Sequence, residues 1–575
     1  MNKPLILSLA AAALLSTNLN AQSMLERFEA MERQMNALKQ EIAELKSERV
    51  NSSKNIIEDD DSEEEDEVAS NDVEDSEDAE ESDEDETVIA SADENDDEDD
   101  EDENDDENEE LASDEERIAD LEESVAELSR NTSGSHLKFK IDYRFAIENM
   151  QYDMADGSKA ENDAFMTNRL WIDMGYKATN NLSFKGQLAY NKAFGARSGS
   201  LGQNGNAYET FDWIANENAY DDQIRVRQAY FLWQDQEFFG LDIPWTFSVG
   251  RRPSTNGHLI NFRDDDHASS PLAHGINVEF DGASAKFTLS KEWGTSVKLC
   301  AGRGLSNAAP KFSATPYSET QDVGDIDLAG LIFVLYDDKQ YSFNTMYYYA
   351  DGLIDVTNIQ DANQGFNTVG GMHSATANLS INGIGNEWSE FLDETTFFIS
   401  GAFSRTDPDN KASYQTNVYA PDGSILGQRT VESGMLGSNK PVTGYSYWIG
   451  TQFPSLITED GRWGLEFNHG SKDWRSITYA EDTNIGSKIA VRGNAYEAYL
   501  TEYLVDDILS IQLRYTYIDY DYTGSNGFFG NESGSSIDID SLKAAAAAGN
   551  PQARQSLGSV VESAQDIRFY IRYRY

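Results

Sequence analysis

The sequence predicts an all-β fold: a transmembrane antiparallel β-barrel of about 16 strands over residues 132–575, preceded by a helical and acidic N-terminal arm. From residue 132 onwards, apolar and polar residues alternate in runs, and alternation places them on opposite faces of a strand. Short turns also alternate with long connections, as at the two rims of an outer-membrane barrel. The 27 phenylalanines, 28 tyrosines and 42 glycines supply the aromatic and turn-forming residues that many strands need.

Residues 1–21 are predicted to form a signal peptide. Lys3 precedes an apolar run from Leu5 to Leu15, and Ala21 is a small residue suited to cleavage. The apolar run is shorter than the roughly 20 residues of a transmembrane helix, and the sequence offers no other candidate of that kind. We therefore expect an exported protein that crosses the outer membrane with strands.

The N-terminal arm is predicted to have two ordered ends and a disordered middle. Residues 22–50 repeat apolar residues at spacings of four and three, which predicts a periplasmic coiled coil; one amphipathic helix against the barrel would show the same pattern. Residues 51–110 are expected to be a disordered acidic linker, because 35 of the 53 residues from Glu58 to Glu110 are Asp or Glu. Residues 111–131 resume the apolar spacing and predict a short helix.

Strand-like runs can be followed from one end of the barrel region to the other. They begin near Leu137, Asn168, Leu182, Gln223, Trp245, Gly275, Ala285, Asp327, Tyr341, Met372, Thr395, Thr443, Arg462, Ile489, Ile508 and Gln565. This count of 16, give or take about two, treats the DGAS sequence at Asp281–Ser284 as a turn and residues 285–301 as one strand. An even number of strands returns the C-terminus to the rim at which the N-terminal arm enters.

The last nine residues suit a strand with one face towards lipid. Apolar and aromatic side chains share one face, and the arginines share the other. The residues of the apolar face are Ile567, Phe569, Ile571, Tyr573 and Tyr575. An alternating apolar run that ends in an aromatic residue resembles the signal read by the barrel-assembly machinery. The resemblance implies that Phe569, Ile571, Tyr573 and Tyr575 meet that machinery, and outer-membrane lipid afterwards.

Two stretches resemble known families of outer-membrane proteins. The stretch IRVRQAYFLW at Ile224–Trp233 and the stretch WTFSVGRRP at Trp245–Pro253 resemble the R-Q-A-Y and V-G-R strand pair of Gram-negative general porins. The run GRRPSTNG at Gly250–Gly257, with FDGA at Phe280–Ala283, is similar to an uncharacterised porin-like family, DUF3373. The long acidic linker departs from the porin pattern.

The porin resemblance implies that Ser254–His274 is a loop that constricts the pore. Strand parity places Arg225 and Arg227 on the lumen side, and Arg227 matches the arginine of the porin R-Q-A-Y strand. The charged cluster implied for the loop is Arg263, Asp264, Asp265 and Asp266. Opposed charges across a pore create a transverse field that orients dipolar solutes. The alternative is that Arg227 pairs with a carboxylate of a neighbouring strand and the aspartates lie in a solvated external loop.

Strand parity adds a basic wall on the lumen side, since the first and last strands of a closed barrel are neighbours. Its members are Lys138, Lys140, Arg144, Arg568, Arg572 and Arg574. The three histidines His258, His267 and His274 lie in the implied loop, but their spacing matches no metal-ligand motif. We expect solvated loop histidines, no metal and no cofactor.

These features predict an outer-membrane porin, in which small hydrophilic solutes or ions diffuse passively through a water-filled lumen, and a homotrimer. The sequence contains no catalytic motif that would indicate an enzyme, and its formal net charge of -59 argues against nucleic acid as a partner. Two alternatives remain open. The protein could tether the outer membrane to a cell-wall or periplasmic partner through its N-terminal arm, or its barrel could sheathe a separate electron-transfer cytochrome.

Overall fold

The computed structural model describes the barrel region and leaves the N-terminal arm undescribed. The described residues are 137–195, 224–254, 256–305, 325–356, 366–385, 388–409, 413–419, 424–432, 436–478, 481–524 and 536–575. The signal peptide, coiled coil, acidic linker and short helix predicted for residues 1–131 therefore lie outside the described residues. None of the helices in the described ranges is long and apolar enough to cross a membrane.

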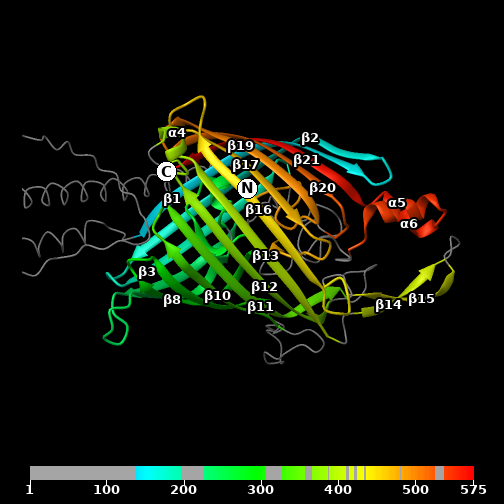
Figure 1. Cartoon of the computed structure of the whole chain (residues 1–575), viewed down its shortest axis with the longest axis horizontal. Helices are drawn as coiled ribbons and strands as arrows, with labels where there is room; N and C mark the ends of the chain where they lie inside the picture. The colour runs from blue at the N-terminus through cyan, green and yellow to red at the C-terminus, as the bar shows by residue number, and fades with distance from the viewer. Residues whose placement is uncertain are drawn as a thin grey trace, which may run out of the picture. The chain divides into compact units, whose positions relative to one another are not determined.

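Sixteen antiparallel strands form one closed barrel, which confirms the predicted all-β barrel and its strand number (Figure 1). In chain order they are β1 (Leu137–Met154), β2 (Lys159–Lys177), β3 (Leu182–Ala193), β4 (Arg225–Asp235), β5 (Trp245–Ser254), β8 (Ile276–Ser290), β9 (Thr295–Leu305), β10 (Ile326–Asp337), β11 (Tyr341–Val356), β12 (Phe366–Asn382), β13 (Thr396–Pro408), β16 (Thr443–Pro454), β17 (Arg462–Gly470), β19 (Gly493–Val505), β20 (Leu509–Tyr520) and β21 (Val561–Arg574). Strand β21 pairs with both β20 and β1, so the last strand closes the sheet onto the first.

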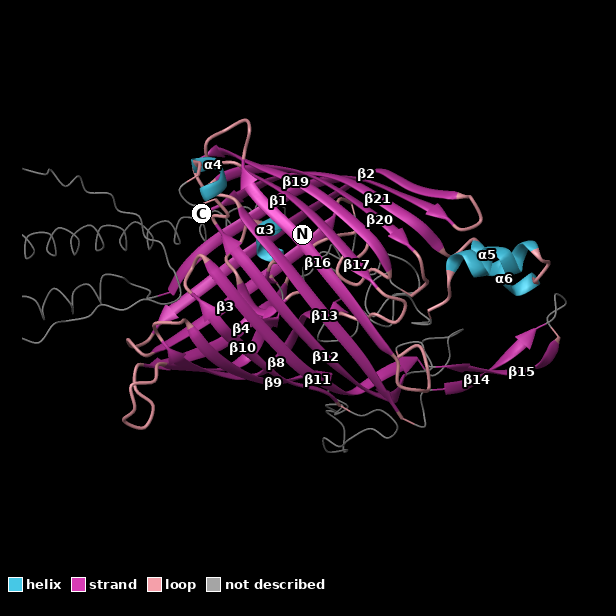
Figure 2. Ribbon diagram, in the orientation of Figure 1, coloured by secondary structure: helices cyan, strands magenta, loops and turns pink. Residues whose placement is uncertain are grey.

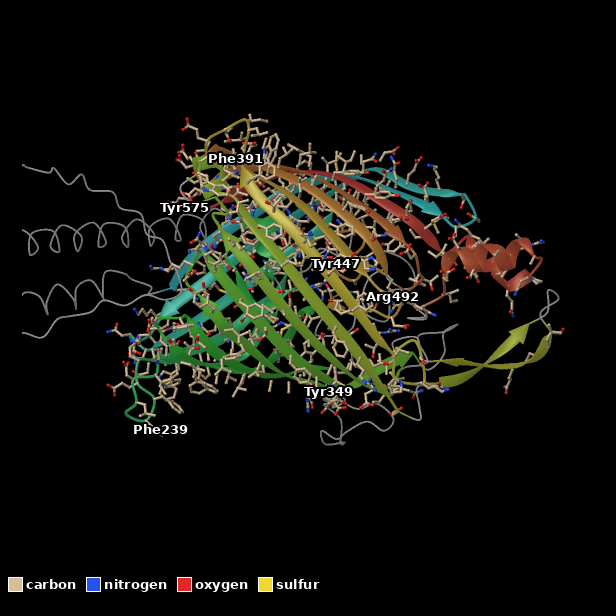
Figure 3. All side chains as sticks on the ribbon, viewed as in Figure 1. Phe239, Tyr349, Phe391, Tyr447, Arg492 and Tyr575 are labelled. Atoms are coloured by element: carbon tan, nitrogen blue, oxygen red, sulfur yellow. The ribbon has the colours of Figure 1, made fainter. Side chains whose placement is uncertain are left out.

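The two rims of the barrel carry different connections. One rim holds the C-terminus, tight turns such as residues 506–508, and the short helix α4 (Glu390–Asp393); Figure 3 shows Phe239, Phe391 and Tyr575 at this end. The opposite rim carries the hairpin of β14 (Ser413–Tyr419) and β15 (Ile425–Glu432), and the helices α5 (Ile539–Ala547) and α6 (Pro551–Leu557). The side chains of Asp538 and Asn550 accept hydrogen bonds from the first turns of α5 and α6, which fixes where these two helices begin.

The prediction of a turn at Asp281–Ser284 is wrong, because β8 runs straight through this sequence. Gly282 pairs with Gly250 and Gly302, and a Cβ atom at Gly282 would lie 2.3 Å from the carbonyl oxygen of Ala301. Glycine there permits close approach of β8 and β9 rather than a turn. The turn lies at residues 291–294, where Gly294 has a φ of 61°. The strand expected over residues 285–301 is therefore divided between the end of β8 and most of β9. The total of 16 strands is unchanged.

The outward face of the barrel is apolar, and the inward face is charged on the first and last strands. On β1 the odd-numbered Phe139 and Ile141 are 55% and 42% exposed, whereas the even-numbered Asp142, Arg144 and Glu148 are buried. Strand β21 continues the pattern. Its outward residues Ile567, Ile571 and Tyr573 are exposed, and its inward residues Asp566, Arg568 and Arg572 are buried. An apolar belt around a polar interior is the arrangement of a barrel that faces lipid.

Two connections fold into the lumen. The first inner loop, residues 256–275, contains β6 (Gly257–His258), α3 (Ile260–Asp264) and β7 (Ser269–Leu272); Figure 2 shows α3 within the outline of the barrel. The second inner loop, residues 471–492 without the undescribed 479 and 480, contains β18 (Ile477–Thr478). β18 pairs in parallel with the start of β8. The second inner loop was not predicted, and the strand expected near Ile489 begins only at Gly493 because Ile489 belongs to this loop.

Apolar side chains pack the two inner loops against the barrel wall. One cluster joins Leu272, Ile276 and Ile477 to inward-facing residues of β10, β11 and β12, such as Met346 and Met372. A second cluster packs residues of both inner loops, including Ile260 and Ile489, around Phe398 and Trp448 of the wall. The lumen therefore contains hydrophobic cores of its own, and the inner loops are held by burial of apolar surface as well as by polar contacts.

Candidate pore constriction

Five buried arginines stand on the lumen wall where the last strands meet the first. Arg144 of β1 lies directly opposite Arg169 of β2 and Arg572 of β21, so these three guanidinium groups form one row across the sheet. Arg514 of β20 lies opposite Arg568 of β21 in the next row. Like charges so close need anionic partners when they are buried. The inner loops supply most of these partners.

Asp482 of the second inner loop is the hub of this basic cluster. Its carboxylate pairs with Arg144 at 2.6 Å and lies 3.5 Å from nitrogens of Arg169 and Arg568. Its backbone carbonyl accepts hydrogen bonds from Arg514 at 3.0 Å and from Arg568 at 2.6 Å. Burial alone would raise the pKa of Asp482, but Arg144 and Arg568 outweigh it and hold the pKa well below its usual range. We call Asp482 and its four arginine partners the arginine clamp.

The aspartates of the first inner loop are held by the end of β21. Arg572 donates to Asp266 at 2.6 Å and to the carbonyl of Asp264 at 2.7 Å, and it also pairs with Asp142 of β1. Arg574 pairs with the carboxylate of Asp265, whose other contact is the hydroxyl of Tyr503 at 2.6 Å. Opposed charges thus meet at the first inner loop, and Arg572 and Arg574 form the basic side.

Arg263 and Lys488 connect the two inner loops to each other and to β19. Arg263 is fully buried on α3; it pairs with its neighbour Asp264 at 2.8 Å and donates to the backbone carbonyl of Glu481 in the second inner loop. The guanidinium of Arg263 also lies 3.7 Å from Glu497 of β19. Lys488 of the second inner loop pairs with the same Glu497. The two loops therefore form one polar unit inside the barrel.

His274 fixes the C-terminal end of the first inner loop. Its two ring nitrogens lie 2.7 Å and 2.8 Å from the hydroxyls of Ser400 and Ser446 on the wall. Its backbone carbonyl accepts from Ser476 of the second inner loop at 3.1 Å. Burial lowers the pKa of His274 to about 3, so the ring is neutral at physiological pH. The prediction of a solvated loop histidine is wrong for His274, which has no exposed surface, while His267 is exposed.

Arg225 and Arg227 stand on the wall at β4, as expected from strand parity. Arg227 is buried above the ring of Trp171, 4.2 Å from its centroid. It hydrogen-bonds Gln187 at 2.5 Å and lies 3.5 Å from the carboxylate of Glu279. Arg225 is half-buried at the start of β4, opposite Ala189 of β3. Glu279 belongs to β8, which is separated from β4 by β5, so this carboxylate is not the one on a neighbouring strand that the alternative named. The loop aspartates contact Arg572 and Arg574 of the wall rather than lying in a solvated external loop.

Lys138 and Lys140 are exposed at the start of β1, close to the rim at which Arg574 ends β21. They therefore belong to the mouth of the lumen rather than to the arginine clamp. Arg169, Arg514 and Asp482 were missed by sequence reasoning. The alternation of side chains along β2 and β20 would have placed Arg169 and Arg514 on the inward face. No local sequence pattern identifies Asp482 as their partner.

Known structures of similar fold are distant. OmpT of Vibrio cholerae (in-vitro folded), an outer membrane protein, is 10% identical over 76% of this chain and 97% of its own, with a TM-score of 0.36. OmpF of Salmonella typhi, in complex with daunomycin, is 11% identical over 76% and 97%, with a TM-score of 0.37. OprB of Pseudomonas putida is 12% identical over 78% and 96%, with a TM-score of 0.40.

One family model matches most of the barrel. It is described as a protein of unknown function, DUF3373, and covers residues 159–575. No curated protein matches the chain.

Proposed function

The chain belongs to the DUF3373 family, whose function is unknown, and we propose that it is an outer-membrane porin that lets small hydrophilic solutes or ions pass passively. The observation that carries the proposal is the closed 16-strand barrel, which is apolar outside and has a cluster of buried charges inside where its first and last strands meet. Barrels of about this strand number enclose an aqueous lumen, whereas barrels of about eight strands are filled by their wall side chains. Here the two inner loops narrow that lumen.

The partly exposed charges at the C-terminal rim are the proposed selectivity determinants. The side chains of Arg574, Asp265 and Asp266 are 28%, 24% and 19% exposed, so all three are partly open to water. Lys138 and Lys140 are exposed nearby on β1. A solute that leaves or enters at this rim meets cations and carboxylates on facing surfaces.

Liposome swelling tests solute passage directly. The full-length protein, reconstituted into liposomes, should admit sugars and amino acids at rates that fall steeply with solute size. Matched liposomes with heat-denatured protein are the control. Swelling equal to that control for every solute would reject the porin proposal and favour the tether.

The ion preference is tested at the rim. Arg574→Gln should shift the reversal potential in a KCl gradient towards cation selectivity, because it removes a cation and leaves Asp265 without its ion pair. Arg303→Gln is a matched control, because Arg303 also pairs with an aspartate, Asp327 at 2.7 Å, but on the exposed outer face. An unchanged reversal potential in Arg574→Gln would contradict the assignment of the rim.

We propose the outer membrane as the location, a homotrimer as the assembly, and a periplasmic position for the N-terminal arm. The inner loops occupy lumen space that an enclosed cytochrome would need, which argues against the sheath alternative. The tether alternative is distinguished by deleting residues 22–130: a porin keeps its solute permeability without them.

A further inference from the structure

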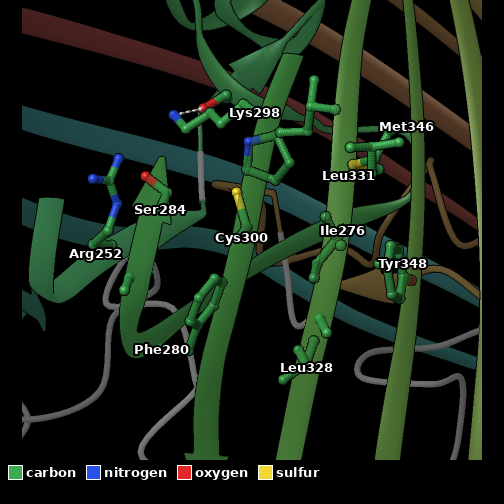
Figure 4. A pocket seen from close by; sticks show the side chains of 16 residues that line it. Arg252, Ile276, Phe280, Ser284, Lys298, Cys300, Leu328, Leu331, Met346 and Tyr348 are labelled. Atoms are coloured by element: carbon green, nitrogen blue, oxygen red, sulfur yellow. Dashed lines mark hydrogen bonds between the residues drawn. The ribbon is translucent and has the colours of Figure 1, made fainter. Parts of the chain in front are cut away.

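A cavity lies between the barrel wall and the first inner loop, on the side of the lumen formed by β8, β9, β10 and β11. Its volume is about 50 Å³, measured as the space open to the centres of water-sized molecules, and it is partly open to solvent. Ser270 and Pro271 of β7 border it from the loop, and the wall strands form its floor (Figure 4). It is separate from the residues of the arginine clamp.

The cavity exists because the wall residues beneath it are short. Ser284 of β8, Cys300 of β9 and Gly330 of β10 lie opposite one another in one row across the sheet. The next residue in that row, Tyr348 of β11, is large, and its hydroxyl donates to the carbonyl of Gly275 at 2.8 Å. Tyr348 therefore keeps the first inner loop away from the wall at this end of the row, and the short side chains leave the space under Pro271 unfilled.

One end of the cavity is apolar. Ile276, Phe280, Leu328 and Met346 line it and are at most 8% exposed. These side chains belong to the largest apolar cluster inside the barrel. A ligand with a hydrocarbon ring or branched chain would gain by covering them.

The other end of the cavity is cationic. Arg252 lies over the ring of Tyr230, and its Nη1 atom is buried without a hydrogen-bond partner among the described residues. Lys298 donates to the hydroxyl of Ser270 at 2.6 Å. Figure 4 shows Arg252, Ser284 and Lys298 together on one side of the cavity and Ile276, Met346 and Tyr348 on the other. A buried guanidinium nitrogen without an acceptor is costly, so an anionic group at this end would be stabilised.

We propose that this cavity binds a small amphipathic organic anion: a carboxylate attached to an apolar ring or branched chain. The carboxylate accepts hydrogen bonds from Arg252 and Lys298, and the apolar body packs on Phe280 and Met346. The proposal goes beyond the porin function, since a solute site beside the lumen does not require the barrel to conduct. A neutral apolar molecule would leave Arg252 without an acceptor, and a small inorganic anion would leave the apolar end uncovered.

Cys300, the only cysteine of the chain, reports on occupancy of the cavity because it lies in its floor. The full-length protein in liposomes is treated with N-ethylmaleimide at constant pH, and the alkylation rate of Cys300 is measured with benzoate or benzamide present. Benzoate should slow alkylation, and benzamide should need a concentration about tenfold higher for the same protection, because it lacks the charge. Equal protection by the two compounds, or protection by neither, would overturn the proposal.

Arg252→Gln should remove the preference for benzoate over benzamide. Arg303→Gln, which deletes a guanidinium from the outer face, should keep it. Retention of a heat-sensitive, fast-migrating band on unboiled gels checks that each barrel has folded. If Arg252→Gln does not fold, Lys298→Met carries the same expectation. A folded variant of either kind that still prefers benzoate as strongly as wild type contradicts the assigned cationic end.

Discussion

The barrel wall contacts the inner loops differently on two sides of the lumen. Where β20 and β21 meet β1 and β2, the wall presents long charged side chains, and the inner loops place Asp482, Asp265 and Asp266 among them. Where β8, β9 and β10 form the wall, one inward-facing row, Ser284, Cys300 and Gly330, is short, and the first inner loop spans it without filling the space. Long charged residues therefore dock a loop, and short residues leave a chamber beneath it.

The largest effect is expected from Asp482→Ala on the clamped side. It leaves Arg144, Arg169 and Arg568 buried without their shared carboxylate, and breaking a buried ion pair in this way costs about 3 to 5 kcal/mol. Guanidinium unfolding in lipid vesicles measures the loss. The double variant Arg144→Ala/Asp482→Ala should recover part of it. A loss below about 1 kcal/mol in the single variant, as expected for an exposed ion pair, would contradict a stabilising role for the clamp.

A smaller loss is expected from Met346→Ala on the cavity side. Met346 is 4% exposed in the apolar cluster, and truncation of such a residue costs at least about 2 kcal/mol. We expect the low end of the range, because part of the side chain already faces the cavity. The same vesicle assay applies, and the ion selectivity should stay that of wild type. A changed selectivity would show that the two sides are coupled.

His274 should contribute to the pH dependence of stability through the first inner loop. Its pKa is about 3 in the folded protein against about 6.5 in an unfolded chain, so the unfolded state binds more protons between these values. Its contribution to stability is complete above pH 6.5 and falls by up to about 1.4 kcal/mol per pH unit as the pH drops towards 3. His274→Gln should be less stable at pH 8 and should have a shallower pH dependence. If the free energy of unfolding depends on pH in the same way in the variant and in wild type, His274 does not contribute to the pH dependence.

The smallest effect is expected on the outer face. Arg303 and Asp327 are 46% and 51% exposed, and exposed ion pairs contribute below about 1 kcal/mol. Arg303→Gln should therefore change neither stability nor solute passage measurably in the vesicle assays. A loss as large as that of Asp482→Ala would show that burial does not explain the difference between the clamp and other ion pairs.

The sequence predicts the wall far better than it predicts the lumen contents. A period of two along β1 and β21 is sufficient to assign Arg144, Arg568 and Arg572 to the interior, because each strand fixes its own two faces. The turn at Asp281–Ser284 was wrong because Asp and Gly favour turns, and the glycine instead meets the neighbouring backbone. Asp482 could not be found locally: Arg144, its partner, lies 338 residues away, and only the closed barrel brings them together.

Single-channel recording tests the central claim, that the arginine clamp holds the second inner loop across an otherwise wide lumen. Wild type and Asp482→Ala are inserted into the same planar bilayer system, with Arg303→Gln as the control for a lost ion pair. We expect small stepwise openings in wild type and in the control, and openings several times larger, or noisier, in Asp482→Ala, because the second inner loop loses its hub. Equal conductance in all three proteins would contradict the clamp, and the absence of channels in all three would contradict the porin itself.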